Sequence, residues 1–381
     1  MWTIHRVSRH RVARGIGEIT SVGELLVGPV SGGYSAIMEF SRRTLGMFAA
    51  SAGFVRAEPP AARAPVGLVL SHEQFPTSRL LDYARQAEAA GFAFVWASDH
   101  LQPWQDNQGH SMFPWLTLAL VGERTRRVTF GSGVTCPSYR HHPTEVAQAF
   151  ASLELLAPGR TFLGLGTGEA VNEQAGTGQY GRYAERHDRL VEAITLIRRL
   201  WTGERVTFRG RFFSTDQLKL YDLPSKPPPV YVAAQGPKSA RLAGQHGDGW
   251  ITQAGASLDP ALRDAFAAGA RAAGKNPDTM PKWAELFAVV GDQREIDLAA
   301  QRWRFTVNPA DLPNPEAIQE AAQATPLAEV AGRWAVGTDP AVHVAAVRKL
   351  LDAGVTPFLH FPQEDPGVAI EFYRARVLPA L

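Results

Sequence analysis

The sequence of 381 residues contains only one cysteine, Cys136. One cysteine cannot form an intramolecular disulfide, so the small disulfide-framed secreted domains are excluded as a class. The chain also lacks an excess of one charge, because 39 Lys and Arg residues are opposed by 37 Asp and Glu residues. Proteins that bind nucleic acid by neutralising phosphates need a clear basic excess. We therefore expect no nucleic-acid partner.

Several other patterns are missing. No apolar run approaches the ~20 residues that a membrane-spanning helix needs. The zinc spacings HExxH and CxxC do not occur, and the adjacent His141 and His142 would point apart on a strand, so we expect no metal site. A serine-hydrolase elbow, G-x-S-x-G, is also absent. What remains is a globular chain with 45% hydrophobic residues, long enough to bury a large core.

The first 57 residues differ in charge from the rest of the chain. They carry seven Arg and three Glu, which leaves 32 basic and 34 acidic residues for the remainder. Arg42-Arg43 precedes a short apolar run at residues 46–55, and Arg56-Ala57 follows it, in the order of an export signal. The paired arginines resemble a twin-arginine signal, which implies the twin-arginine translocation machinery as a partner and a location in the cell envelope. A basic N-terminal tail without a targeting function is the alternative.

The sequence predicts three segments. Residues 1–57 form the leader, and Met38 could serve as an alternative start, in which case residues 1–37 are not translated. Residues 58–65 are a Pro/Ala-rich linker. Residues 66–381 form one catalytic domain.

Short apolar runs alternate with longer amphipathic segments in that domain. The runs predict eight strands, at residues 66–71, 92–98, 128–133, 161–166, 230–234, 249–252, 285–290 and 355–361. Helical spacing follows most of them, at 79–90, 144–156, 185–201, 238–246 and 340–353. Eight apolar strands covered on both faces favour an α/β fold, the parallel (β/α)8 TIM barrel. A doubly wound sheet is the alternative, but residues 71–75 (SHEQF) do not form the Gly-rich loop expected after its first strand.

Two longer segments interrupt the alternation. Residues 172–222 follow the fourth strand and include a predicted hairpin around 205–213, and residues 293–330 follow the seventh strand. Insertions of this length after barrel strands usually shape the mouth of the active site.

Polar residues at the ends of the second and fourth strands carry the strongest chemical signal. Asp99-His100 with Trp104 combines an imidazole, a neighbouring carboxylate and a flat indole. Residues 164–168 (GLGTG) precede Glu169, which could exchange a proton there. A buried strand-end histidine and an ordinary tight turn are the structural alternatives.

Two further strand ends are weaker candidates. After the third strand, residues 131–137 form a polar bend, in which Cys136 fits better as a small packing residue than as a nucleophile. After the fifth strand, residues 233–239 lead into a helix, where backbone amides and Lys238 could hold an anion. An ordinary helix start explains the second pattern equally well.

Together these motifs resemble the coenzyme F420-dependent branch of the bacterial luciferase-like barrel enzymes. The matching segments follow one another in order from residue 66 to the C-terminus, at 98–104, 121–125, 147–151, 166–173 and 247–250. The resemblance is strongest to the members that oxidise hydroxymycolic acid, which are similar to those that oxidise glucose 6-phosphate. It implies a luciferase-like barrel, coenzyme F420 as cofactor and hydride transfer from a secondary alcohol. It also allows a homodimer.

The resemblance implies a role for each site residue. His100 would take the hydroxyl proton and Glu169 would protonate the deazaflavin, with Trp104 and Glu73 beside the reacting centre. A bulge at Gly133-Val134, with a non-proline cis peptide, would lie behind the cofactor ring. The positions that match cofactor contacts are Asp99, Val134, Cys136, Thr167, Gly168, Asn172, Gln235, Gly236, Lys238 and Ser239. Cys136 and Gln235 depart from the residues of the sugar-phosphate enzymes, which puts those two contacts in doubt.

The substrate side departs further. Three basic residues hold the sugar phosphate in those enzymes, and this chain keeps one of them, Arg333. Ala256 replaces one lysine, and residues 293–316 contain no lysine that could serve as the other. Each charge-assisted contact contributes about 1.5–3 kcal/mol, so their loss argues against glucose 6-phosphate. We expect a lipidic alcohol instead, oxidised from hydroxymycolic to ketomycolic acid. Aromatic residues could line its apolar mouth, namely Phe113, Trp115, Trp283, Trp303 and Phe305.

Three alternatives stay open from the sequence. One is the F420-dependent oxidation of glucose 6-phosphate, and another is an FMN-dependent luciferase-like monooxygenase. A third, from outside the enzymes, is an exported solute-binding protein, which would have two lobes.

Overall fold

The computed structural model describes residues 65–307 and 311–381. The predicted leader lies outside these residues, as does the predicted linker apart from Pro65. Among the described residues, no helix is both long enough and apolar enough to cross a membrane.

Eight parallel strands close into a barrel. They follow one another around it in chain order, and β9 pairs with both β8 and β11, while β11 pairs with β1 and so closes the ring. Their bounds are β1 Gly67–Leu70, β2 Phe94–Ala97, β3 Thr129–Ser132, β4 Thr161–Leu165, β7 Val230–Ala233, β8 Gly249–Gln253, β9 Lys282–Val289 and β11 Thr356–His360. All eight predicted strands are confirmed. The seventh begins three residues earlier than predicted, at Lys282, which brings Trp283 into the barrel. A closed barrel is not the two-lobed form that the solute-binding alternative requires.

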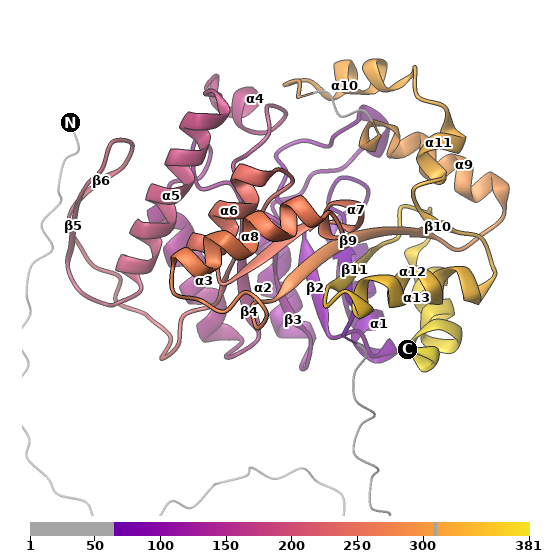
Figure 1. Cartoon of the computed structure of the whole chain (residues 1–381), viewed down its shortest axis with the longest axis horizontal. Helices are drawn as coiled ribbons and strands as arrows, with labels where there is room; N and C mark the ends of the chain where they lie inside the picture. The colour runs from indigo at the N-terminus through magenta and orange to yellow at the C-terminus, as the bar shows by residue number, and fades with distance from the viewer. Residues whose placement is uncertain (1–64, 308–310) are drawn as a thin grey trace, which may run out of the picture. The chain divides into compact units, whose positions relative to one another are not determined.

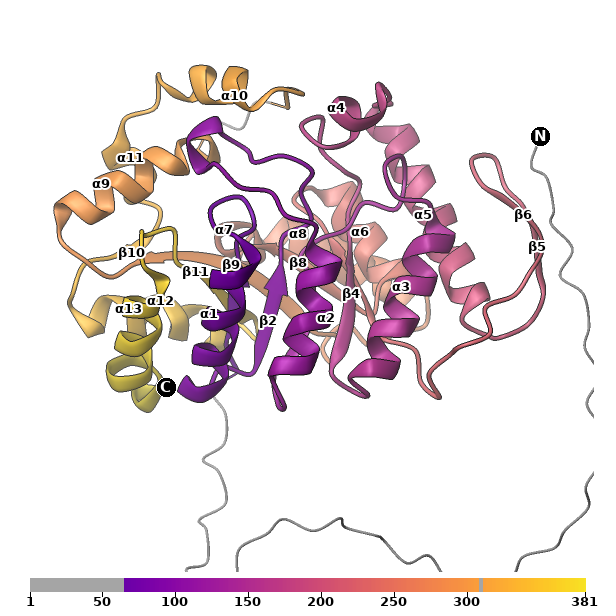
Figure 2. The same ribbon diagram turned by 180° about the vertical axis from the view of Figure 1, so that it is seen from behind.

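Helices surround the barrel (Figures 1 and 2). The larger ones are α1 Thr77–Ala90, α2 Pro114–Arg124, α3 Pro143–Leu156, α5 Tyr183–Leu200, α6 Pro237–His246, α8 Pro260–Ala272, α12 Pro340–Asp352 and α13 Pro366–Phe372. Gly91 and Gly354 lie just after the ends of α1 and α12, with φ of 98° and 71° in the left-handed region where helices commonly end.

Both predicted insertions are present. After β4 the chain forms α4 Glu173–Thr177, α5, and a hairpin of β5 Val206–Arg209 and β6 Ser214–Leu218, which lies outside α5 in both views. After β9 it forms α9 Gln293–Arg302, the turn η3 Arg304–Thr306, α10 Pro315–Ala322 and α11 Leu327–Ala331, and then β10 Ala335–Val336, which pairs with β9. The remaining short elements are η2 Asp106–Gln108, α7 Ala254–Ser257, η4 Tyr373–Val377 and η5 Leu378–Ala380.

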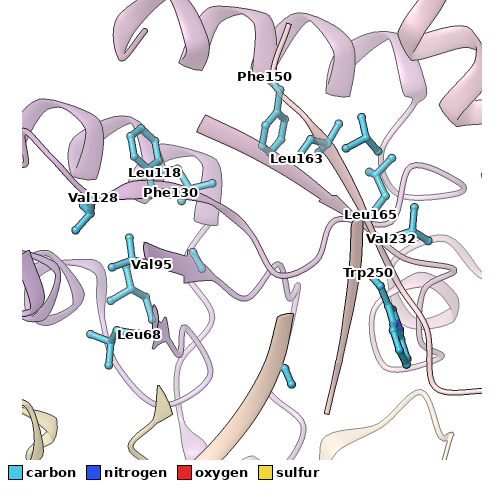
Figure 3. Packing of buried hydrophobic residues seen from close by; sticks show 14 of the residues in the cluster. Leu68, Val95, Leu118, Val128, Phe130, Phe150, Leu163, Leu165, Val232 and Trp250 are labelled. Carbon is cyan, nitrogen blue, oxygen red and sulfur yellow. The ribbon is translucent and has the colours of Figure 1, made fainter. Parts of the chain in front are cut away.

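The core has two parts, because side chains alternate along each strand. Outward-facing residues such as Leu68, Val95 and Phe130 stand in register on β1, β2 and β3, and Leu118 of α2 lies against Phe130 (Figure 3). A second cluster takes one residue from each of seven barrel strands, which is only feasible inside the barrel: Val69, Trp96, Phe162, Tyr231, Ile251, Trp283 and Phe358. This aromatic layer fills the barrel, so a ligand can bind only above it, at the carboxyl ends of the strands.

Candidate active site

A cavity opens above the aromatic layer. The space between its walls is about 860 Å³, including its open mouth. All eight barrel strands or the loops after them contribute to its lining: Val69, Glu73, Trp96, Ser98, His100, Trp104, Gly133, Val134, Glu169, Ala233, Ala234, Gln235, Ile251, Thr252, Gln253, Glu285, Phe287, Trp303, Phe305, Thr306 and His360. The four residues predicted to carry chemistry, His100, Glu169, Trp104 and Glu73, are all among them.

Glu73 and His100 form an acid–imidazole pair from the first two strand ends. Their closest atoms, Oε1 and Nε2, are 3.7 Å apart. Both side chains are buried, and the other oxygen of Glu73 accepts hydrogen bonds from the hydroxyls of Ser71 and Ser98, at 2.9 and 2.6 Å. Burial raises the pKa of Glu73, but His100 and the Ser98 hydroxyl outweigh this effect, so its pKa lies below the usual value. Glu73 is therefore a fixed anion beside the imidazole.

The other ring nitrogen of His100 has a partner for either tautomer. Its Nδ1 lies 3.3 Å from the carbonyl oxygen of Gln102, an acceptor, and 3.2 Å from the amide Nδ2 of Asn172, a donor. The amide of Asn172 is oriented because its Oδ1 accepts from the backbone N–H of Leu101 at 2.8 Å, and its Nδ2 also lies 3.4 Å from Glu169. Asn172 thus connects the two predicted proton-exchanging residues, His100 and Glu169. The other nitrogen of His100, Nε2, lies on the side of Glu73, and both residues line the cavity.

The loop after β4 places Glu169. Gly168 has φ of 81°, and a Cβ there would lie 2.7 Å from Sγ of Cys136, so only glycine fits. The Gly168 carbonyl accepts hydrogen bonds from Arg186 and Tyr180, at 2.9 and 3.1 Å. Thr167 and Gly168 do not line the cavity themselves, and they hold Glu169 at its wall.

A bulge after β3 forms part of the cavity wall. The Gly133–Val134 peptide is cis, as the resemblance implies, and both residues line the cavity. Room for the bulge comes from the facing strand, because a Cβ on Gly166 would lie 2.8 Å from Val134. Cys136 is buried behind it, and burial raises the pKa of its thiol well above the ordinary value. A thiol that stays protonated is a packing residue rather than a nucleophile.

Asp99 points away from the cavity. Its carboxylate accepts hydrogen bonds from Arg140 at 2.7 Å, Thr135 at 2.6 Å and the indole of Trp115 at 3.1 Å. Burial raises its pKa, but His141, Arg140 and Thr135 outweigh that effect, so the pKa lies well below the ordinary value. Asp99 therefore fixes the strand end that carries His100, and its side chain is not the orienting anion beside the imidazole. Glu73 fills that position.

The predicted residues after β7 are divided. Gln235 lines the cavity. Gly236, Lys238 and Ser239 belong to the start of α6, where the Ser239 hydroxyl donates to the carbonyl of Gly236 at 2.9 Å and accepts from its N–H at 3.1 Å. The Lys238 side chain is exposed.

Only part of the predicted aromatic mouth is present. Trp104, Trp303 and Phe305 line the cavity, and Trp104 stacks on Phe305 with ring centroids 4.7 Å apart. Trp283 lies instead in the aromatic layer below, and Trp115 stacks on His141 and does not line the cavity.

Arg333 lines a neighbouring cavity of about 700 Å³, which shares four lining residues with the main one, namely Gln253, Glu285, Phe287 and Thr306. Its guanidinium is half-exposed and lies 3.3 Å from Glu329. Among the described residues that line the main cavity there are three acids, Glu73, Glu169 and Glu285, and no lysine or arginine.

The sequence interpretation missed one pair that faces the cavity, Glu285 and His360. Both fell within predicted strands, whose residues were read as core. Strand parity could have found them, because each stands two residues after an aromatic residue that points into the barrel, Trp283 and Phe358.

Known proteins match this chain over most of its length. A family model described as luciferase-like monooxygenase matches residues 54–357. The F420-dependent hydroxymycolic acid dehydrogenase of Mycobacterium tuberculosis is 64% identical over 322 residues, which are 84% of this chain and 89% of that protein. The F420-dependent glucose-6-phosphate dehydrogenase of Nakamurella multipartita is 40% identical over 338 residues, 85% of this chain and 97% of that protein. A solved F420-dependent secondary alcohol dehydrogenase, in complex with an F420–acetone adduct, has a TM-score of 0.79 at 31% identity and covers 84% of this chain and 99% of its own.

Proposed function

The chain belongs to the luciferase-like monooxygenase family, and from this premise we propose that it is an F420-dependent dehydrogenase that oxidises a secondary alcohol to a ketone. The observation that carries the proposal is the Glu73–His100 pair in the cavity, connected through Asn172 to Glu169. The relatives with the same cofactor in their names act on hydroxymycolic acid, on glucose 6-phosphate and on a secondary alcohol. Hydroxymycolic acid is the substrate we favour.

The cavity fits a flat cofactor. The absence of a side chain at Gly166 leaves room for Val134, so the bulge contributes an apolar residue to the cavity wall. Val134, Gln235 and Glu169 would hold the deazaflavin ring of coenzyme F420, and the turn at Gly236 and Ser239 lies next to Gln235 along the chain. When bound, coenzyme F420 supplies a carbon that accepts a hydride.

The residues of this chain supply the proton transfers. His100 takes the hydroxyl proton of the alcohol at Nε2, and Glu73 stabilises the imidazolium that results. Trp104, whose ring centroid lies 4.9 Å from that of His100, limits the directions from which the alcohol can approach. Glu169 lies on the opposite side of Asn172, where it would exchange a proton with the bound cofactor. Trp303 and Phe305 exclude water and offer an apolar wall to a lipid chain.

The charge of the cavity supports an uncharged substrate. Its three acids and its lack of basic residues, among the lining residues that the structure describes, would repel a phosphate group. Arg333 lines the neighbouring cavity and not this one. Glucose 6-phosphate is therefore disfavoured as the substrate.

Two measurements test the proposal. Titration of the purified protein with F420 and with FMN should give tight binding of F420 only. Anaerobic incubation with F420 and a panel of alcohols should reduce the cofactor with secondary lipid alcohols and not with glucose 6-phosphate. Tight FMN binding without F420 binding would favour the monooxygenase alternative.

We also propose export to the cell envelope by the twin-arginine pathway. The support is the order of Arg42-Arg43, the apolar run and Arg56-Ala57, together with the envelope lipid named for one relative. The double substitution Arg42→Lys with Arg43→Lys should retain the protein in the cytosolic fraction of an actinobacterial host. Equal distribution of native and substituted protein would contradict export by this route.

A further inference from the structure

A second acid–imidazole pair faces the same cavity, from the last two strands of the barrel, β9 and β11. Glu285 of β9 accepts a hydrogen bond of 2.7 Å at Oε1 from Nδ1 of His360, the last residue of β11. The imidazole stacks on Phe287, with centroids 4.3 Å apart and planes at 21°, and meets Trp303 edge-on at 4.3 Å. These contacts fix the ring, so the direction of its second nitrogen is set by the fold.

That second nitrogen has no partner. Nε2 of His360 is buried and makes no hydrogen bond to any residue that the structure describes. A carboxylate oxygen can only accept, so the proton of a neutral His360 ring lies on Nδ1 and the lone pair on Nε2. The side chain is only 3% exposed, and the residue lines the cavity. A buried acceptor without a donor at the wall of a cavity points to a ligand group that bonds it there.

The surrounding charge indicates which group fits. The cavity lining already holds Glu73, Glu169 and Glu285, so a carboxylate or phosphate would be repelled there. An alkyl chain would leave the buried lone pair unpaired and would forfeit a hydrogen bond. A neutral hydroxyl can donate to Nε2 without adding charge.

The two pairs are close to each other. β11 pairs directly with β1, the strand that leads to Glu73, and Glu73 and His360 line the same cavity. A hydroxyl bound at His360 would therefore belong to the same small part of the substrate as the hydroxyl at His100.

We propose that His360, oriented by Glu285, binds a second hydroxyl of the substrate, near the one that is oxidised. This inference rests on the proposed function and refines it, because a secondary alcohol with another hydroxyl within a few bonds of the carbinol carbon should be preferred over the corresponding mono-alcohol. His360 is then a specificity-determining residue, while His100 acts on the reacting group.

The test compares alcohols that differ in one hydroxyl. Octane-2,3-diol and octane-2,4-diol are compared with octan-2-ol in anaerobic F420 reduction by the full-length protein. The native enzyme should prefer the better diol by about tenfold in kcat/KM, as expected for one neutral hydrogen bond. Equal kcat/KM for the diols and the mono-ol would overturn the inference, and this arm needs no variant to fold.

A matched pair of variants locates the effect. In His360→Asn the amide can still bond Glu285 but nothing replaces Nε2, so the diol preference should fall to within about twofold. In His360→Gln the amide reaches the place of Nε2, so part of the preference should remain. Undiminished preference in His360→Asn would contradict the inference. So would a loss of F420 affinity in His360→Asn without a change in diol preference, because Nε2 would then face the cofactor.

A binding measurement separates this inference from the proposed function. Trp104 and Trp303 line the cavity, so quenching of tryptophan fluorescence reports occupancy without turnover. Tighter binding of a diol than of octan-2-ol, abolished in His360→Asn, would support the subsite even if no alcohol reduced F420. F420 reduction without any diol preference, in turnover and in binding, would leave the proposed function intact and remove the subsite.

Discussion

The two acid–imidazole pairs of the cavity differ in how fully their polar atoms are occupied. Around Glu73 and His100, two serine hydroxyls bond the carboxylate, and the far nitrogen of the imidazole has both a donor and an acceptor within reach. Around Glu285 and His360, one hydrogen bond joins the pair and the far nitrogen is unpartnered among the described residues. The first pair is suited to proton transfer, because both nitrogens of its imidazole have partners. The second pair is suited to ligand binding, because one nitrogen of its imidazole is available for a hydrogen bond.

Exposure separates them in the same way. The side chain of Glu73 is 3% exposed and that of Glu285 is 23% exposed. Electrostatic interactions are stronger where water is excluded, so the charge of Glu73 is screened less by solvent than that of Glu285. Chemistry is therefore expected at β1 and β2, and recognition at β9 and β11.

The largest expected effect distinguishes the two histidines in turnover. His100→Ala should lower kcat about 10²–10⁴-fold, because a positioned general base is lost. His360→Ala should lower kcat/KM for a diol about tenfold, as a lost hydrogen bond would. Anaerobic F420 reduction measures both, with F420 binding as the control for an intact site. A similar loss in both variants would erase the distinction between base and binding residue.

The two carboxylates should differ in stability. Glu73→Ala leaves the buried hydroxyls of Ser71 and Ser98 without their acceptor and should cost about 3 kcal/mol of unfolding free energy. Glu285→Ala removes one bond at a partly exposed site and should cost about 1 kcal/mol. Urea unfolding at neutral pH provides the values. As a control, Ser71→Ala added to Glu73→Ala should restore part of the loss, and no recovery would mean that the hydroxyls were not the cause.

Acid should act mainly on the β1 side. Burial lowers the pKa of His72, the neighbour of Glu73, to about 4 from the 6.5 of the unfolded chain. Between these values only the unfolded state takes up the proton, so stability falls as the pH decreases, by about 2 kcal/mol from pH 6.5 to 5. His72→Gln should flatten this slope in urea unfolding. An unchanged slope would assign the acid sensitivity to another group.

Arg333 should matter least. Its exposed ion pair with Glu329 contributes about 0–1 kcal/mol, and it lies outside the main cavity. Arg333→Ala should change kcat/KM for an uncharged alcohol by less than about twofold. A tenfold loss would show that the neighbouring cavity binds part of the substrate and that the charge of Arg333 contributes to this binding.

The fold could be predicted from the sequence because barrel strands are short, apolar and regularly spaced. All eight predicted strands exist, and the error at the start of β9 arose because Lys282 and Trp283 do not look like the beginning of a buried run. Because of that error, Glu285 was the first residue of the predicted strand. In the structure it stands two residues after Trp283 and therefore faces inward as Trp283 does.

The candidate site could be predicted only where motifs lie on loops. His100 and Glu169 were found from their neighbours in the sequence, and Asn172 from the resemblance to the F420-dependent enzymes. The contact between Asn172 and His100 spans 72 residues and depends on the closure of the barrel, so no local pattern reports it. Asp99 is the carboxylate next to His100 in the sequence, but the preceding strand places its side chain toward Arg140, and the carboxylate beside the imidazole is the distant Glu73.

The proposed reaction can be tested with an alcohol that carries deuterium on the carbinol carbon. The protein is incubated anaerobically with F420 and the labelled secondary alcohol, and the reduced cofactor is examined by mass spectrometry. Hydride transfer predicts that each reduced F420 carries one deuterium and that one ketone forms for each. Reduced cofactor without deuterium, or a product that contains oxygen from another source, would contradict a dehydrogenase at this site.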